Sequence, residues 1–130
     1  MSTPYRVLVT GSRTWEDVDT IVGALRQIRR DIEGRPIVVV HGDCLTGADA
    51  IASYLVQQAA PTFGLTEEKH PANWRSGGQL DRAAGFRRNA EMVNLGADVC
   101  LAFIRDGSRG ASHTADLAEK AGIPTRRFTA

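Results

Sequence analysis

Apolar residues along this chain fall alternately into short continuous runs and into stripes with helical spacing. Continuous runs at residues 5–10, 37–40 and 99–104, and more polar ones at 66–70 and 125–128, predict five strands. Between them, apolar residues recur every three or four positions, which predicts amphipathic helices. The first three stripes are Val18, Ile21, Val22, Leu25, Ile28 and Ile32; Ala48, Ile51, Ala52, Leu55, Val56 and Ala59; and Phe86, Ala90, Val93 and Ala97, with Gly96 closing the third helix. A fourth helix is predicted over about 112–121, and residues 71–81, rich in glycine and polar side chains, predict a loop.

Strands that alternate with helices predict right-handed crossovers and a parallel sheet covered on both faces. We therefore expect one Rossmann-like, three-layer α/β domain over residues 1–130, with a five-stranded parallel sheet. Central strands of such a sheet are apolar on both faces, whereas charged strands suit its edges. The charged runs 66–70 and 125–128 then give the order 3-2-1-4-5, with the topological switch point between strands 5–10 and 99–104. Ligands of open α/β sheets bind beside that point.

Two small, polar loops follow the strands that flank this switch point. One contains Gly11, Ser12, Arg13 and Trp15, and the other contains Ser108, Arg109, Gly110 and Ser112. Glycines let a backbone approach an anion, helix amino termini offer free N–H groups, and arginine forks onto phosphate. The loops predict a phosphate site, although each taken alone is also compatible with an ordinary turn that caps a helix.

A third loop follows strand 37–40 and contains Gly42, Asp43, Gly47 and Asp49. It forms neither a Walker A loop nor a complete GxGxxG fingerprint, which argues against an ATPase and a standard dinucleotide-binding domain. Asp43 and Asp49 are candidates for holding ribose hydroxyls; forming a turn or capping the next helix would be the structural alternative.

Other candidate ligand contacts lie in the third helix and in the tryptophans. Arg88 and Asn89 come early in that helix, where a basic side chain can face the crevice, but a solvated helix face is the alternative. Trp15 and Trp74 both fall in predicted loops, where a tryptophan either stacks on a base or covers a core edge.

Charge and composition exclude several classes of protein. The net charge of +1 gives no overall field for nucleic acid or an anionic membrane, and we expect neither as a partner. The histidines lack the spacing of a structural zinc motif, so no metal is predicted, and Cys100 reads as a buried thiol. Without a signal peptide or a run long enough to span a bilayer, the predicted location is the cytoplasm.

Six ordered segments resemble the SLOG superfamily, and in particular its small bacterial and phage YspA-related branch. They are VTGSRTW, HGDCLTGAD, PANW, AGFRRNAEM, GADVCLAF and SRGASHTA, and they extend over nearly the whole chain. The superfamily includes Lonely-guy phosphoribohydrolases, which cleave the base from nucleoside 5′-monophosphates, and DprA/Smf DNA-processing proteins. The resemblance implies a Rossmann-like fold and a nucleotide-related ligand, such as an NAD or ADP-ribose derivative.

The resemblance supports ligand binding better than it supports the hydrolytic activity of Lonely-guy enzymes. Lonely-guy enzymes carry an Arg-Lys pair followed by a PGGxGTxxE loop. Here Arg88 matches the arginine, Asn89 replaces the lysine, and Thr114 stands where the glutamate is expected. A carboxylate can stabilise the oxocarbenium ion that forms when an N-glycosidic bond breaks, and a threonine hydroxyl cannot.

These observations favour a sensor or sequestering domain that binds a nucleotide-type ligand and needs no further cofactor. The alternatives are a nucleotide N-glycosidase with Arg88 and Asp43 as catalytic residues, and a single-stranded nucleic-acid binder like DprA. Few aromatic residues and a near-neutral charge argue against the nucleic-acid binder. A chain this short is also compatible with a homo-oligomer that completes the pocket.

Overall fold

The structure is a computed structural model that describes residues 3–76, 78–81 and 83–130. Four helices and a short 3₁₀ turn (Pro61–Phe63) alternate with strands along the chain. The helices are α1 (Val18–Asp31), α2 (Ala48–Gln58), α3 (Ala84–Asn94) and α4 (Arg109–Lys120). The strands are β1 (Tyr5–Gly11), β2 (Ile37–His41), β3 (Leu65–Lys69), β4 (Arg75–Ser76), β5 (Gln79–Leu80), β6 (Val99–Ile104) and β7 (Thr125–Thr129).

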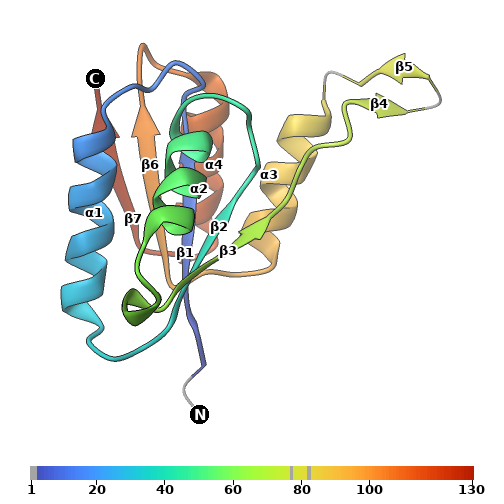
Figure 1. Cartoon of the computed structure of the whole chain (residues 1–130). Coiled ribbons are helices and arrows are strands. Elements are labelled where there is room, and N and C mark those ends of the chain that lie inside the picture. The colour runs from blue at the N-terminus through green and yellow to red at the C-terminus, as the bar shows by residue number, and fades with distance from the viewer. Residues whose placement is uncertain (1–2, 77, 82) are drawn as a thin grey trace.

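Five strands form one parallel sheet in the order β3-β2-β1-β6-β7, so the predicted α/β class is confirmed. β1 lies in the centre and its Leu8, like Val7 and Val9, is fully buried. The strand numbers differ from the expected 3-2-1-4-5 because two short strands, β4 and β5, precede the last two strands of this sheet in the chain. These two strands pair as an antiparallel hairpin inside the predicted loop 71–81 and project beyond α3, away from the sheet (Figure 1). The hairpin was not predicted, since strands of two residues leave no periodic pattern.

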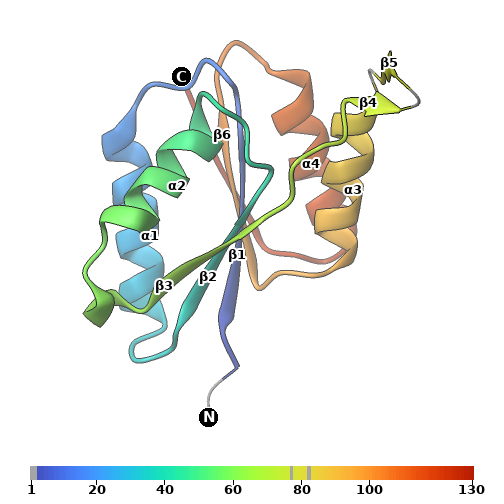
Figure 2. The ribbon, with the colours of Figure 1, turned by 45° about the vertical axis from the view of Figure 1, so that its right-hand side comes forward.

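Helices cover both faces of the sheet and give it the three layers of a Rossmann-like fold (Figure 2). α1 and α2 pack on one face, where the core includes Ile21, Ile28, Val39, Ala52 and Phe103. α3 and α4 pack on the other face, where the core includes Leu8, Val40, Met92, Cys100 and Ala118. Cys100 is fully buried as predicted, and this burial raises the pKa of its thiol to about 12. No helix among the described residues is both long and apolar enough to cross a membrane.

Helix ends follow from local chemistry, and the structure differs from the predictions at one helix start and at one residue predicted to face the core. α1 begins after Asp17, whose carboxylate accepts a hydrogen bond from Thr20 N at 3.1 Å. α4 begins at Arg109, three residues before its expected start at 112, because residues 109–111 carry no apolar pattern that marks them as helical. In α3, Phe86 is 44% exposed although its spacing placed it in the apolar stripe. Gly96 (φ +85°) ends this helix as predicted.

Candidate functional site

A cavity of about 490 Å³ lies at the carboxyl ends of β1 and β6, beside the predicted switch point. Its walls come from the loops after β1, β2 and β6, from the segment before β4, from α3, and from the first turns of α2 and α4. Eight of the predicted site residues line it: Gly11, Ser12, Arg13, Asp49, Arg88, Asn89, Ser108 and Gly110. The remaining six do not: Trp15, Gly42, Asp43, Gly47, Arg109 and Ser112. The cavity therefore draws on all three loops singled out by the sequence, but not on all their residues.

Ser12 connects β1 to β6 and α2 rather than presenting a free hydroxyl. Its backbone N–H donates to Phe103 O at 2.9 Å, and its Oγ accepts from Arg105 N at 2.8 Å. The same Oγ donates to Arg105 O at 3.3 Å, so both hydrogen-bonding capacities of the hydroxyl are used inside the protein. Ser12 thus positions the cavity floor, and its predicted role as a ligand donor gains no support from this geometry.

Three of the predicted glycines are required by packing. A Cβ at Gly11 would lie 2.3 Å from the Cβ of Ala48, because α2 crosses β1 at that point. A Cβ at Gly42 would lie 2.3 Å from the Arg88 guanidinium. Gly47 has φ +78° and touches the backbone of Ser12. Glycine in these loops therefore brings secondary-structure elements together, a reason that the sequence alone does not distinguish from close approach to an anion.

The amino terminus of α4 opens onto the cavity without a side-chain cap. Ser108 occupies the N-cap position and makes no capping hydrogen bond, in contrast to Asp17 at α1. Ser108, Gly110 and Ala111 all line the cavity, and a Cβ built on Gly110 meets nothing within 4 Å. Ser112 lies one turn further along, where its N–H donates to Ser108 O at 3.0 Å. The first N–H groups of α4 are thus available to an acceptor in the cavity.

Arg88 is a buried cation that joins two strand ends. Its Nη1 donates to Gly42 O at 2.6 Å and to His70 O at 3.1 Å, and its Nε donates to Asn89 Oδ1 at 2.7 Å. Arg88 and Asn89 are only 8% and 7% exposed, yet both line the cavity. Among the described residues Nη2 of Arg88 has no hydrogen-bond partner, so this nitrogen remains as a donor.

Asp49 and Asp106 line the cavity, whereas Asp43 does not. Asp49 Oδ2 accepts from Gly42 N at 3.2 Å and Cys44 N at 3.4 Å, so Asp49 orders the preceding loop and does not cap α2. Burial raises the pKa of Asp49, and burial together with the nearby Asp49 raises the pKa of the Cys44 thiol. Asp43 N donates to His41 Nδ1 at 3.0 Å, while the Asp43 side chain lies outside the cavity lining. The geometry does not favour Asp43 as a catalytic residue.

Several residues outside the predicted site also line the cavity, among them Arg105 and Trp74. Arg105 is 39% exposed, and its Nη1 donates to Thr14 O at 2.8 Å across the cavity mouth. Its position directly after a strand of the switch point was the available signal. Trp74 lines the cavity, whereas Trp15 is 3% exposed and packs on Phe103 with ring centroids 5.5 Å apart. The sequence left both tryptophans open as stacking residues, and of the two only Trp74 lines the cavity.

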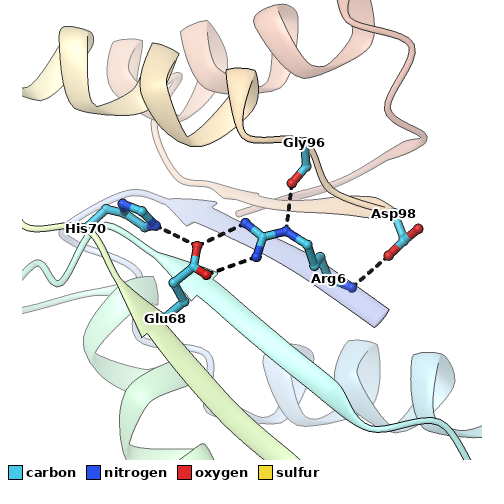
Figure 3. A network of polar contacts seen from close by, with 5 residues as sticks. All are labelled: Arg6, Glu68, His70, Gly96 and Asp98. Carbon is cyan, nitrogen blue, oxygen red and sulfur yellow. Dashed lines mark hydrogen bonds and ion pairs between the residues drawn. The ribbon is translucent and has the colours of Figure 1, made fainter. Parts of the chain in front are cut away.

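Behind the cavity, a polar network holds the His70 segment to the sheet (Figure 3). Arg6 donates from Nη1 and Nη2 to both carboxylate oxygens of Glu68 at 2.9 Å, and His70 Nε2 lies 2.7 Å from Glu68 Oε2. The Nε of Arg6 donates to Gly96 O at 2.9 Å, which links the network to the turn after α3. Because Arg88 donates to the carbonyl of His70, this network positions one wall of the cavity.

This network predicts how stability depends on pH. Hydrogen bonds from Arg6 and then from His70 lower the pKa of Glu68 from 4.5 to about 2. A carboxyl group whose pKa is lower in the folded state stabilises the fold above pH 4.5 and loses that contribution as pH falls towards 2. We expect Glu68→Gln to lower the free energy of unfolding at pH 7 by about 1 kcal/mol, after allowing for solvent screening, and to flatten the decline between pH 4.5 and 2.

Urea unfolding at pH 7, 4.5 and 3 provides the measurement, with Glu33→Gln, an exposed carboxylate after α1, as the control. An unchanged pH dependence in Glu68→Gln would contradict the assigned role of the Arg6–Glu68 pair.

No group of three or more histidine, cysteine, aspartate or glutamate side chains is arranged for a metal within the described ranges. Arginine and asparagine side chains are among the polar groups that line the cavity.

Comparisons of the sequence with known proteins identify a family. The family model described as "YspA, cpYpsA-related SLOG family" matches residues 5–77, which include β1 to β3 and the loops after β1 and β2. The Gene 61 protein of Mycobacterium phage D29 is 45% identical over 125 residues, covering 95% of this chain and 95% of that protein. No solved structure gives a significant match.

Proposed function

Because this chain belongs to the YspA, cpYpsA-related SLOG family, we propose that its cavity binds a nucleotide-related, phosphate-bearing ligand. The observation that carries the proposal is the uncapped amino terminus of α4 facing a cavity that Arg13, Arg88 and Arg105 also line. Helix N–H groups and arginines together are the usual protein partners of phosphate. The ligand class includes an NAD or ADP-ribose derivative, and the domain acts as a sensor or a sequestering protein.

Binding without hydrolysis accounts best for the side chains around α4. Thr114, which replaces the catalytic glutamate of Lonely-guy enzymes, is fully buried and donates to Gly110 O at 3.0 Å. Asp116 pairs with Arg127 at 2.8 Å on the surface and does not line the cavity. Asp49 accepts two backbone N–H groups at a single oxygen, which commits that oxygen to loop structure. Asp106 also lines the cavity, but its side chain is 85% exposed and lies 3.7 Å from Arg105 Nε. The geometry therefore favours binding over an N-glycosidase.

Ser108→Asp tests the phosphate site without weakening the helix. An aspartate at the N-cap accepts the first N–H groups of α4 and adds a negative charge where we place the phosphate. We expect the free energy of unfolding to stay constant or rise by about 0.5 kcal/mol, while the affinity for inorganic phosphate and for 5′-mononucleotides falls about ten-fold or more.

Titration calorimetry measures the affinities, and urea unfolding measures the stability. Ser108→Asn is the matched control, because asparagine caps a helix as well as aspartate but carries no charge. Equal losses of affinity in both variants would mean that cap geometry, and not charge, disturbs binding. Unchanged affinity in Ser108→Asp would remove α4 from the site.

A further inference from the structure

The two tryptophans of the chain lie in different environments, and one of them gives the cavity an aromatic surface. Trp15 is 3% exposed within the core, whereas Trp74 is 37% exposed and lines the cavity. The side chains of Phe86 and Met92 on α3 line the same cavity. Of the phosphate-binding groups proposed above, Arg88 also comes from α3, and the others come from the loops after β1 and β6 and from α4. The cavity thus combines an apolar wall, formed by Trp74 and α3, with polar donors that come mostly from other elements.

The Trp74 ring is held between a glycine and a cation. A Cβ on Gly85 of α3 would lie 2.8 Å from the ring carbon Cη2, so this helix passes directly against the edge of the indole. The Cζ atom of Arg13 lies over the ring, 5.1 Å from its centroid. Arg13 is exposed and lines the cavity, and its side chain reaches Trp74 from the loop after β1. A ring face in contact with a flexible exposed cation is accessible to another flat group once that cation moves.

We propose that the Trp74 face covered by Arg13 is the base-stacking subsite of the cavity, so that the ligand is a nucleotide recognised through its base as well as its phosphate. This inference rests on the proposed function. A base displaces the Arg13 guanidinium from the ring, and the released arginine pairs with the phosphate. An exposed cation–π contact is worth about two-fold to five-fold in affinity, whereas base stacking on an aromatic side chain contributes about five-fold to 150-fold. Replacing the Arg13 guanidinium on the ring by a base is therefore favourable. Arg13 is then a specificity-determining residue, because it pairs with the phosphate only when the ligand is bound.

The first experiment compares a sugar phosphate with nucleotides that differ from it by the base. Ribose 5-phosphate and the four 5′-mononucleotides AMP, GMP, CMP and UMP are titrated into the full chain by calorimetry. We expect at least one nucleotide to bind about ten-fold or more tightly than ribose 5-phosphate. In Trp74→Ala no nucleotide should bind more tightly than ribose 5-phosphate binds to the same variant, whereas Trp74→Phe should keep part of the difference. Circular dichroism checks that both variants fold.

The second experiment uses Arg13→Ala, for which the exchange predicts changes of opposite sign. The affinity for the best nucleotide should fall about ten-fold because the phosphate loses a partner. The affinity for the corresponding nucleoside, which has no phosphate, should rise about two-fold to five-fold because the ring face no longer carries a cation. A role of Arg13 in phosphate binding alone would leave the nucleoside affinity unchanged and would overturn the exchange.

The outcomes separate this inference from the proposed function. If ribose 5-phosphate binds as tightly as every nucleotide, or if Trp74→Ala retains the advantage of the base, the stacking subsite is wrong and the phosphate site stands. If neither ribose 5-phosphate nor any nucleotide binds, the proposed function fails and the subsite fails with it.

Discussion

Replacing Arg88 by alanine is expected to reduce ligand affinity about a hundred-fold and to lower the free energy of unfolding by about 3 kcal/mol. The guanidinium donates to the carbonyls of Gly42 and His70, which end two neighbouring strands. These buried acceptors lose a charged donor in Arg88→Ala, and Asn89 loses the partner of its Oδ1. The loops that shape the cavity should loosen, so stability and binding should fall together. Urea unfolding and calorimetry with 5′-mononucleotides measure the two effects.

Arg87→Ala is the matched control for this substitution. Arg87 is the preceding residue of α3, but its side chain is 59% exposed and pairs with Asp81 at the surface. An exposed ion pair contributes up to about 1 kcal/mol, and Arg87 does not line the cavity. If Arg88→Ala proves as stable as Arg87→Ala, the buried hydrogen bonds of Arg88 do not hold the loops together. An unchanged affinity in Arg88→Ala would exclude this side chain from the ligand site.

Gly47→Ala is expected to destabilise the protein by about 4 kcal/mol, since two costs combine. Gly47 adopts φ +78° and ψ −149°, a conformation that is essentially restricted to glycine. A Cβ would also lie 2.2 Å from Ser12 O and 2.6 Å from Arg13 Cα, both backbone atoms that cannot turn aside. Relief of this contact moves the loop after β1, so Arg13 and the cavity floor should shift. The free energy of unfolding in urea measures the loss.

Gly23→Ala provides the control at another glycine. Gly23 lies inside α1, and a Cβ there meets nothing within 4 Å. Alanine has the higher helix propensity, so this variant should gain up to about 1 kcal/mol. Opposite signs at the two positions are the result that we expect. A Gly47→Ala variant with native stability would show that the loop after β1 relaxes freely, contrary to its connection to α2 through Ser12.

The strand pattern of the sequence was sufficient to predict which loops meet. Continuous burial of β1, β2 and β6 requires a covered sheet, and the charges on β3 and β7 place those strands at its edges. Parallel strands bring their carboxyl ends to one edge, so the loops after β1 and β6 had to lie side by side. The hairpin of β4 and β5 was not predictable in this way, because strands of two residues are too short to show a periodic pattern.

The sequence by itself determined the fold class, the central position of β1 and the loops that form the cavity, because hydrophobic periodicity and glycine positions act through local geometry. Only the tertiary structure decided which side chains of those loops face the cavity. The hydroxyl of Ser12 is hydrogen-bonded to the backbone of Arg105, ninety-three positions away. Trp15 is buried in the core, whereas Trp74 is not. Asp49, and not Asp43, lines the cavity because α2 turns it towards the loop after β2. Whether a loop residue contacts a ligand or stabilises the fold depends on residues that are distant in the chain. No local sequence pattern specifies which residues those are.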